Sequence, residues 1–549
     1  MKILLILPFN VYGGKYDNDI ILNKGGEAEL PLGLAYLKSY IKSKIPEIEI
    51  SIYDSNIDAM NYIITQDNNV SMEFLWNRVK NKLEDFNPDI VGISTFSHAV
   101  ADVAHNVVAL CKKSNNNIMT IMGGSYPTLS YDWAMEDENL DIIVRSEGEI
   151  VFYNLVKALL NNEPVSNIKG IVFRDNGKVV VNPMEQKIQN LDSLPYPDLE
   201  DLPVDLYAKL PRHSLQRTIK DLRAISIVFA RGCVFQCGFC ATKKVWGNIR
   251  YRSPKNVIEE IKYLKSKYDI NFIKINDDLF TFDPNRVIEI CDLLIKERII
   301  EHWSSTGLTV KSLLNKEMVK KMVASGYHYF TLAIESGCEN TLKTIKKPLK
   351  LSMVKEVVEH LRQYREIYVT GGFIVGFPFE TKEDIQQTVD MASSLDLNWA
   401  SFNMFTPFPK TPLYDECIEK GYLKNKQVEY NDLQNTSVLS TPNFDKEWLE
   451  DYKYLNNLKI NFVNNYFLKK GNYKRAIEDF EFILKIAPGH AFALLLTGYS
   501  FDMLGNKREA KAYYEQTKDV FKKDSFWRNY LKACEKELEP IIKIKDFLN

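Results

Sequence analysis

The sequence predicts an α/β protein in three parts. A Rossmann-like, doubly wound domain comes first, a partial (β/α)6 TIM-like barrel follows, and an all-α segment of tetratricopeptide (TPR) type comes last. Two observations predict this order. Apolar runs of strand length alternate with helical patterns to about residue 425, as parallel sheets covered by helices require. Beyond residue 460 the strand-like runs stop and a 34-residue period begins. We set the boundaries at 1–160, 161–215 (hairpin and linker), 216–425, 426–459 (linker) and 460–549.

The composition describes a globular protein of several domains. The 549 residues carry a formal charge of −2, and 45% of them are hydrophobic and 26% charged. This balance gives no support to a basic nucleic-acid-binding surface. No stretch approaches the roughly 18 apolar residues of a membrane span, and residues 1–8 lack the cleavage site of a signal peptide. We therefore expect a cytoplasmic protein, in a compartment that keeps cysteines reduced.

Five strand-like runs define the first domain: residues 3–8, 48–54, 90–96, 118–123 and 140–145. Residues 31–45 and 101–112, between these runs, have the apolar spacing of helices. Ligands of doubly wound sheets bind outside the carboxyl ends of the strands, which places the candidate binding edge at residues 9–14, 94–98 and 123–127. There Gly123 and Gly124 permit close approach of a bulky ligand, although a tight turn alone would explain the pair.

A connecting stretch follows the first domain. Residues 172–180 predict a β-hairpin around an Asn176-Gly177 turn. The Pro-rich residues 191–203 (LDSLPYPDLEDLP) are typical of a connector. We expect residues 161–215 to form a bridge between the two α/β domains.

Three cysteines stand close together in the run RGCVFQCGFC. Cys233, Cys237 and Cys240 have the CxxxCxxC spacing, which can hold three irons of a four-iron cluster and leave the fourth open to a substrate or cofactor. A zinc site is the alternative, but the chain has no second CxxC or HxxxH pair of the kind that zinc sites use. The other five cysteines lie in apolar or helical stretches, and we assign them no chemistry.

The expected barrel strands end on polar residues and glycines. Asp277 and Asp278 follow the run that starts at residue 273, where a helix cap would explain them equally well. The run 327–338 ends on Glu335 and Ser336, and a buried carboxylate needs a partner, either a cofactor or a lysine or arginine. Two more runs carry the remaining candidates, Ser304 in 303–310 and the glycines Gly372 and Gly376 in 371–380, where glycine often marks close approach of a ligand.

The C-terminal segment repeats itself. Gly471, Ala476 and Phe480 occupy TPR positions, and Gly505, Ala510 and Tyr514 stand 34 residues further on. Such helix pairs expose a concave face suited to peptides. Because about three repeats are needed for independent stability, we expect the tail to pack on the catalytic domain or to add helices after Ser525. A packing cap or dimer contact without a substrate role stays an open alternative.

The motifs together resemble a known family. The CxxxCxxC loop with Phe239 before its last cysteine resembles the radical S-adenosylmethionine (SAM) superfamily. With the preceding sheet domain, its segments PLGLAYL, PDIVGIS and GGSYPT and the run RSEGE at 145–149, the chain resembles the cobalamin-binding radical SAM family over residues 1 to about 425. The resemblance implies three cofactors: a [4Fe-4S] cluster on Cys233, Cys237 and Cys240, SAM and cobalamin.

The resemblance also implies which residues meet the cofactors. Those expected near SAM are Phe239, Asp277, Asp278, Ser304, Glu335, Ser336, Gly372 and Gly376. Those expected near cobalamin are Asn10, Tyr12, Gly13, Ser94, Thr95, His98, Gly123, Gly124, Ser125 and Tyr126. Many cobalamin domains carry an Asp-x-His-x-x-Gly loop after the first strand, but residues 9–14 (FNVYGG) hold no histidine. We therefore expect cobalt to have no histidine ligand from the protein, and a structural role for His98 is the alternative to cobalamin contact.

The activity that the resemblance implies is radical chemistry. The enzyme would reductively cleave SAM to a 5′-deoxyadenosyl radical and transfer a methyl group through methylcobalamin to an unactivated carbon of a peptide or small metabolite, as in natural product or peptide modification. The alternative is a cobalamin-dependent radical rearrangement, cyclisation or ring contraction. The intact cysteine triad disfavours a non-catalytic adaptor. A transfer-RNA methylthiolating enzyme is disfavoured because a second cluster domain is missing. The expected partner is an external one-electron donor such as flavodoxin or ferredoxin, with no nucleic acid and no membrane span.

Overall fold

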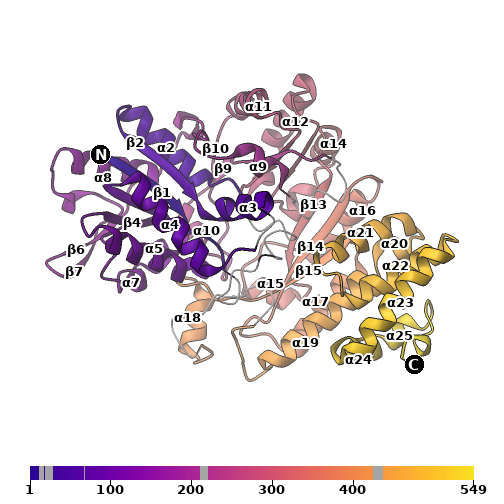
Figure 1. Cartoon of the computed structure of the whole chain (residues 1–549). Helices are drawn as coiled ribbons and strands as arrows, with labels where there is room; N and C mark the ends of the chain where they lie inside the picture. Colours follow the sequence, from indigo (N-terminus) through magenta and orange to yellow (C-terminus); the bar gives the residue numbers. More distant parts are fainter. Residues whose placement is uncertain (12–17, 19–28, 67–68, 211–220, 424–436, 549) are drawn as a thin grey trace.

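The first domain contains a seven-stranded sheet. The computed structural model describes residues 1–11, 18, 29–66, 69–210, 221–423 and 437–548, and in this part of the chain the strand order of the sheet is β2-β1-β3-β4-β5-β6-β7 (Figure 1). The five expected runs form its parallel strands, which are β1 (Lys2–Leu7), β2 (Glu49–Asp54), β3 (Ile90–Ser94), β4 (Met119–Gly123) and β5 (Ile142–Val144). The doubly wound fold is thereby confirmed.

Helices cover both faces of this sheet, which explains why its central strands are continuous apolar runs. On one face α2 and α8 pack together, and on the other α4 and α5 do so. Ile3, Leu4 and Ile6 of β1 are accordingly fully buried. The helices of this domain are α2 (Leu32–Lys44), α3 (Ser55–Gln66), α4 (Met72–Phe86), α5 (Ala101–Ser114), the short α6 (Ser125–Leu129) and α7 (Tyr131–Ala134), and α8 (Gly148–Leu160).

The predicted hairpin forms, but in a different place from the one expected. Its strands β6 (Ile171–Asp175) and β7 (Lys178–Val181) join at Asn176 and Gly177, whose φ angles of 49° and 78° suit a type I′ turn. β6 pairs antiparallel with β5, so the hairpin extends the first sheet and is not part of a bridge between domains. The physical reason is that β5 would otherwise present an open sheet edge.

Six parallel strands form the partial barrel. They are β8 (Ala224–Ile227), β11 (Phe272–Ile275), β12 (His302–Ser305), β13 (Tyr329–Glu335), β14 (Tyr368–Val375) and β15 (Trp399–Met404). Strands β8, β11 and β12 form one ladder, β13 to β15 form another, and a parallel bridge between Trp303 and Tyr327 joins them. Among the described residues β8 and β15 do not pair, as a (β/α)6 barrel that stays open requires.

The helices between these strands cover the outside of the barrel. The longer ones are α11 (Pro254–Tyr268), α12 (Pro284–Glu297), α14 (Lys316–Ala324), α16 (Leu351–Leu361), α17 (Lys382–Ser394) and α18 (Pro412–Glu419). The shorter elements are α9 (Val204–Lys209), β9 (Ala230–Arg231), α10 (Thr242–Trp246), β10 (Arg250–Tyr251), α13 (Val310–Leu313) and α15 (Glu339–Thr344). Two strands stop earlier than their apolar runs predicted, because Gly307 and Gly376 turn the backbone with φ of 71° and 84°.

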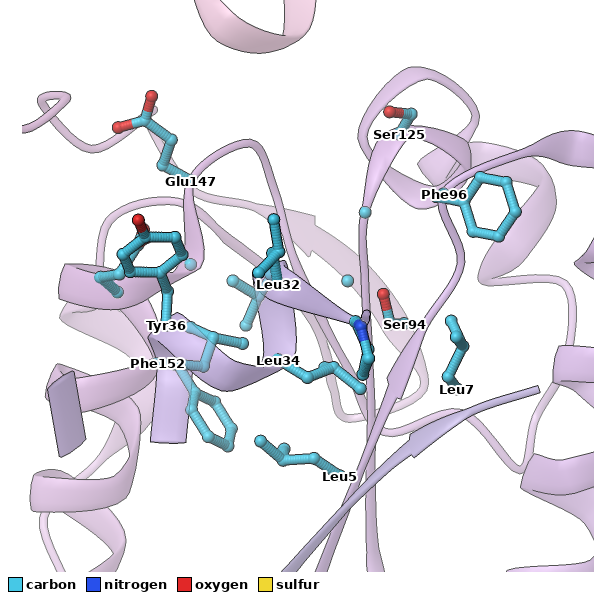
Figure 2. A pocket seen from close by; sticks show the side chains of 18 of the residues that line it. Leu5, Leu7, Leu32, Leu34, Tyr36, Ser94, Phe96, Ser125, Glu147 and Phe152 are labelled. Atoms are coloured by element: carbon cyan, nitrogen blue, oxygen red, sulfur yellow. The ribbon is translucent and has the colours of Figure 1, made fainter. Parts of the chain in front are cut away.

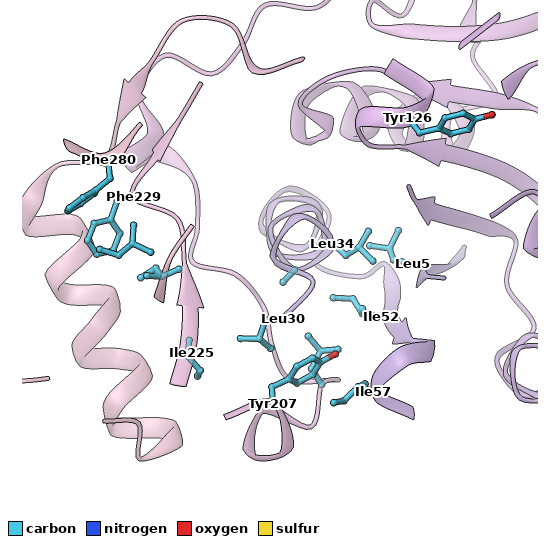
Figure 3. Close-up of a cluster of buried hydrophobic side chains, with 14 of the residues drawn as sticks. Leu5, Leu30, Leu34, Ile52, Ile57, Tyr126, Tyr207, Ile225, Phe229 and Phe280 are labelled. Carbon is cyan, nitrogen blue, oxygen red and sulfur yellow. The ribbon is translucent and has the colours of Figure 1, made fainter. Parts of the chain in front are cut away.

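One buried apolar cluster runs from the first sheet into the barrel. Figure 3 shows Leu30 and Tyr207 between two residues of the first domain, Ile52 of β2 and Ile57 of α3, and the barrel residue Ile225. The Tyr207 hydroxyl donates a hydrogen bond to the buried Asp54 carboxylate at the end of β2. The two α/β domains therefore share a continuous core.

The tail is helical, and the glycines of its 34-residue period stand at matching positions before two of its helices. Its helices are α19 (Lys446–Asn457), a π-helical turn (Leu458–Val463), α20 (Tyr466–Lys469), α21 (Tyr473–Ile486), α22 (Ala491–Met503), α23 (Lys507–Lys523), α24 (Ser525–Ala533), α25 (Glu535–Leu538) and α26 (Lys545–Leu548). Gly471 and Gly505 precede α21 and α23 with φ of 67° and 82°. Ala476, Phe480 and Ala510 are buried between the helices. The first helix, α19, lies inside the stretch expected as a linker.

The tail packs on the barrel beside β14 and β15 (Figure 1). The Asn461 amide completes the outer edge of β15: its Oδ1 accepts from the Ala400 N–H, and its Nδ2 donates to the Ala400 carbonyl, both at 2.7 Å. From α21, Asp479 accepts a hydrogen bond from the Tyr368 hydroxyl of β14 at 3.2 Å. The expected packing of the tail on the barrel domain is thus observed, and these contacts give the tail a structural role.

Candidate functional site

A cavity of about 730 Å³ lies between the carboxyl edge of the first sheet and the barrel. Figure 2 shows side chains of α2 on one side of it and Ser94, Phe96 and Ser125 on the other. The walls nearest the sheet are apolar, since the ends of β1 and the start of α2 supply leucines. The residues of the first domain that line it include Leu5, Leu7, Leu32, Leu34, Ser94, Phe96, Gly123, Gly124, Ser125, Glu147, Gly148 and Phe152.

The barrel closes the other side of the cavity with Ala230, Arg231, Trp246, Asn276 and Asp278. Two buried ion pairs hold the domains together at this rim. Arg231 Nη2 lies 2.7 Å from Glu149 Oε1, and Arg250 Nη1 donates to Glu147 Oε2 at 2.9 Å. Their carboxylates come from the conspicuous run at 145–149, whereas the arginines gave no signal in the sequence. Since buried pairs fix geometry closely, the cavity has a defined shape.

The glycine pair after β4 forms a tight turn at the cavity wall. Gly124 has φ of 113°, and a Cβ atom there would lie 2.4 Å from the Thr95 carbonyl oxygen. The turn therefore needs glycine because β3 and β4 approach each other, which is the simpler of the two interpretations of this pair. Ser94, Gly123, Gly124 and Ser125 nevertheless all line the cavity, as a binding edge at the strand ends predicts.

Four other expected residues of the first domain lie behind the cavity wall. Asn10 is buried, and its backbone N–H donates to Asn56 Oδ1 at 2.7 Å. His98 Nε2 lies 2.9 Å from Ser130 Oγ, and burial lowers the pKa of His98 to about 4. The imidazole is thus neutral at pH 7 and packs on Tyr126. Thr95 is fully buried, and Tyr126 meets His105 at 3.1 Å through its hydroxyl. Tyr12 and Gly13 lie outside the described residues.

The three motif cysteines lie on the loop between β9 and α10. Each is a free thiol that is only partly buried. The loop is tight: the Cys240 N–H donates to the Cys237 carbonyl at 3.1 Å. Gly232, just before the loop, has φ of 90°, and a Cβ atom there would lie 2.6 Å from the Asn248 carbonyl. Phe239 packs on Phe377, with ring centroids 5.8 Å apart. The backbone thus presents three thiols close together at the barrel mouth.

The electrostatics of this loop favour a cationic ligand. Burial, together with the charges of the neighbouring thiols, raises the pKa of Cys233 and raises that of Cys237 to about 11. Three thiolates here would repel one another unless a metal neutralised them. Among the described residues no three Cys, His, Asp or Glu side chains are grouped as ligands of one metal ion. Fe–S clusters are held by cysteine thiolates, and three partly buried free thiols on one tight loop fit that donor set.

Of the two aspartates after β11, one is structural and the other reaches the cavity. Asp277 is buried, and its Oδ1 accepts from the N–H groups of Phe229 and Ala230 at 2.7 and 2.9 Å. Burial raises its pKa to about 7. Asp278 lines the cavity and accepts a long hydrogen bond from Thr242 at 3.5 Å, and burial raises its pKa as well. A role at the cofactor therefore fits Asp278.

Three more residues were expected near SAM, and two of them have partners within the protein. Glu335 pairs with Lys347 at 2.9 Å, which is the lysine partner that the sequence left open. Ser336 is buried against α17, where its hydroxyl lies 2.9 Å from that of Thr388. Ser304 lies on β12 opposite Lys274 of β11.

Gly372 on β14 and Gly376 directly after it do not mark the same kind of contact. A Cβ atom on Gly376 would lie 2.4 Å from Leu449 of α19, so the close approach predicted for this glycine is made by the protein's own tail. At Gly372 the nearest atom to such a Cβ is the Leu332 carbonyl oxygen at 3.7 Å, an ordinary contact. Gly372 therefore stays available to a ligand inside the barrel.

Comparison with known proteins agrees with this arrangement. Residues 19–156 match the family model "B12 binding domain", and residues 227–392 match "Radical SAM superfamily". The chain is 31% identical to the uncharacterized methyltransferase PH0819 of Pyrococcus horikoshii over 427 residues, which is 77% of this chain and 84% of the relative. The chain belongs to the cobalamin-binding radical SAM family.

Two further relatives have more specific names. The anaerobic magnesium-protoporphyrin IX monomethyl ester cyclase of Rubrivivax gelatinosus is 28% identical over 80% of this chain and 75% of its own length. The cytidylyl-2-hydroxyethylphosphonate methyltransferase of Streptomyces wedmorensis is 26% identical over 75% of this chain and 82% of its own. Among solved structures, the radical enzyme OxsB, with aqua-cobalamin and SAM bound, matches all of this chain and 83% of its own at a TM-score of 0.64 and 15% identity, a likeness of fold.

This radical SAM enzyme uses a [4Fe-4S] cluster, SAM and cobalamin. The residues present fit these groups: the barrel mouth offers three thiols, and an apolar cavity of cofactor size lies at the strand ends. In the part of the chain that the structure describes, no helix combines the length and apolar character of a membrane crossing.

Proposed function

We propose that this enzyme transfers a methyl group to an unactivated carbon, with cobalamin in the interdomain cavity and SAM on the cluster held by Cys233, Cys237 and Cys240. The observation that carries the proposal is the continuity of one cavity from the sheet's binding edge to Asn276 and Asp278, at the end of a barrel strand. When bound, these groups supply a carbon radical generator and a methyl carrier. Both groups could then act on the same substrate carbon, one as the radical generator and the other as the methyl carrier.

The chain's own residues would keep the two cofactors in a fixed relation. The pairs Arg231–Glu149 and Arg250–Glu147 set the distance between the domains. Gly123, Gly124, Ser94 and Ser125 leave room for the corrin because none of them projects a large side chain. Asn10, Thr95, His98 and Tyr126 would support that wall from behind. A shared apolar core excludes water, which protects a reactive radical from side reactions.

At the SAM end, the chain offers polar groups around an open iron. We propose that Asp278 and Glu335 receive the polar groups of SAM, with Lys347 holding Glu335 in place. Gly372 leaves space beside β14 for the adenine. Phe239 shields the cluster from the side of Phe377. Asp277 and Ser336 act indirectly, by fixing the ends of strands β8 and β13.

A second candidate function is supported by one observation. The cyclase of Rubrivivax gelatinosus is almost as similar to this chain as the methyltransferase of Pyrococcus horikoshii. A cobalamin-dependent cyclisation or ring contraction without methyl transfer would use the same site. In either case substrate turnover needs an external electron donor, and a flavodoxin or ferredoxin in the cytoplasm suits that task. We propose a peptide or small metabolite as substrate.

Product counting separates the two functions. In turnover with a candidate substrate, methyl transfer yields S-adenosylhomocysteine together with 5′-deoxyadenosine. Cyclisation or rearrangement yields 5′-deoxyadenosine alone, and that outcome would overturn the proposed methyl transfer.

The assignment of the two cofactor sites has its own test. Ser94→Trp should fill the cavity and abolish corrin binding while leaving the iron content unchanged. Cys237→Ala should lose SAM cleavage yet retain corrin. Corrin absorbance after gel filtration and iron analysis give both readouts, and loss of corrin from the Cys237→Ala variant would contradict two separate sites.

A further inference from the structure

A cluster of hydrogen-bond donors on the barrel strands surrounds a single carboxylate from the first domain. Ser226 of β8 donates to Glu29 Oε2 at 3.1 Å, and Asn276, just after β11, donates to the same oxygen at 2.6 Å. Lys274 of β11 forms an ion pair with Glu29 Oε1. Three donors, on two adjacent strands and directly after one of them, therefore converge on one carboxylate.

These donors face the inside of the barrel. On β11 the alternate residues Ile273 and Ile275 are buried toward the covering helices, so Lys274 points the opposite way. Lys274 stands opposite Ser226 on β8 and opposite Ser304 on β12, and residues in register on parallel strands share a face. The interior wall thus carries a cation and several neutral polar groups at one level.

The cluster is open to the interdomain cavity in which the proposed function places cobalamin. Glu29 and Asn276 both line that cavity. The Lys274 and Glu29 side chains keep 28% and 34% of their surface exposed, so the ion pair is only partly covered. A ligand in the barrel could reach Lys274 without any rearrangement of β11.

We propose that Ser226, Lys274 and Asn276 form a binding site for an anionic oxyacid group of the substrate, a carboxylate or a phosphate, and that Glu29 occupies this site when substrate is absent. The inference rests on the proposed function for the identity of the ligand as substrate. Ser226 and Lys274 are fixed on strands, and Asn276 is held directly after β11 because its backbone N–H donates to the Ile227 carbonyl at 2.9 Å, whereas Glu29 lies in no helix or strand. The carboxylate is therefore the partner that can move away, and it leaves behind one positive charge and two neutral donors.

The chemistry of the cluster selects the ligand. Once Glu29 has moved away, the Lys274 ammonium would repel a cationic ligand. Together with the Ser226 hydroxyl and the Asn276 amide N–H, it matches an oxyanion with two or three oxygens. A permanent latch between domains is the rival explanation of the Glu29–Lys274 pair. The two differ in what happens to Lys274 once the Glu29 carboxylate is removed.

The test measures the acetylation rate of Lys274 by an amine-reactive acetylating reagent, read by peptide mass spectrometry on the full-length enzyme with its cofactors. In Glu29→Gln, acetylation of Lys274 should rise at least fivefold over wild type. Added acetate or inorganic phosphate should then slow it at least threefold with saturation. The anion that protects at lower concentration tells a carboxylate substrate from a phosphate substrate.

A matched control sits in the same protein. Lys321 of α14 pairs with Asp292 of α12 on the outside of the barrel, so Glu29→Gln/Asp292→Asn frees two lysines, of which Lys274 belongs to the cluster with Ser226 and Asn276 and Lys321 does not. Anions should protect Lys274 and not Lys321, and adding Asn276→Ala should raise the protecting concentration about tenfold. Equal protection of both lysines, or no protection of Lys274, would overturn the proposal.

A second variant guards against misfolding. Glu29→Asp keeps the charge but shortens the side chain by one methylene, and anions should protect Lys274 in it as well; absence of protection counts against the site. Because the readout needs no SAM cleavage, failure of this site and failure of the proposed methyl transfer are distinguishable.

Discussion

The substitution Gly376→Ala tests whether this glycine is needed for contact with a ligand or for contact with α19 of the tail. Gly376 directly follows β14 with φ of 84°, and an added Cβ would lie 2.4 Å from Leu449 Cδ2 of α19. The substitution should therefore loosen α19 from the barrel. It should leave SAM affinity within twofold of wild type, because the clash is with the protein and not with a ligand.

The magnitude follows from two separate costs. A left-handed backbone costs a non-glycine residue about 1–2 kcal/mol, and overpacking against the fully buried Leu449 adds about 1–3 kcal/mol. Because the backbone strain at Gly376 persists when α19 opens, only the overpacking cost lowers the free energy of α19 opening, by about 1–3 kcal/mol. Leu449→Ala alone costs about 2–5 kcal/mol. The double variant should be less destabilised than the sum by about 1–3 kcal/mol, since one of its two costs has disappeared.

Hydrogen exchange of the α19 amides measures this free energy locally, which suits a protein of several domains better than global unfolding. Gly471→Ala is the matched control: its φ is 67°, but no atom lies within 4 Å of an added Cβ, so only the backbone cost of about 1–2 kcal/mol applies and exchange in α19 should stay as in wild type. A tenfold loss of SAM affinity in Gly376→Ala with unchanged exchange in α19 would refute the reasoning.

Three more predictions follow from the same contacts. Burial raises the pKa of Asp277 from 3.8 to about 7, so the folded state binds this proton more tightly, and the stability contributed by Asp277 is lost as pH rises from about 4 through 7. Asp277→Asn keeps the oxygen acceptor but does not titrate. Its free energy of unfolding, measured with denaturant, should rise by up to ~4 kcal/mol relative to wild type between pH 4 and 8; a free energy of unfolding that changes with pH in the same way in both proteins would contradict this. Arg231→Met leaves Glu149 buried without its cation and should destabilise the domain contact by about 3–5 kcal/mol and weaken corrin binding, with partial rescue by Glu149→Gln; corrin titration that matches wild type would argue against it. Deleting residues 456–549 removes Asn461 from the edge of β15 and should give an insoluble product, whereas a soluble product with uncoupled SAM cleavage would indicate that the tail only recruits substrate.

Features that depend on local sequence could be predicted well. The parallel strands follow from continuous apolar runs, because each strand is buried on both faces. The cysteine loop follows from spacing alone, since three ligands within eight residues must lie near one another. The type I′ hairpin follows from Asn176 and Gly177. In each case the residues that decide the outcome are neighbours in the chain.

Features that depend on distant partners could not be predicted. The sequence of the hairpin does not indicate that β6 pairs with β5, because strand partners are set by the sheet as a whole. Asp277 and Asp278 are adjacent, yet one holds the chain after β8 and the other faces the cavity. The reason for Gly376 is Leu449, 73 residues later (449 − 376). The roles of Arg231 and Arg250 at the cavity rim could not be predicted, because their partners Glu149 and Glu147 lie about 80 to 100 residues earlier in the chain.

The central claim is that three cysteines hold a cubane with one iron open to SAM. Mössbauer spectroscopy of the protein reconstituted anaerobically with ⁵⁷Fe, recorded with and without SAM, tests it most directly. The expected result is a four-iron cluster in which one iron in about four changes its signal when SAM is added. A spectrum without a four-iron cluster, or a cluster in which no iron changes its signal when SAM is added, would contradict the account.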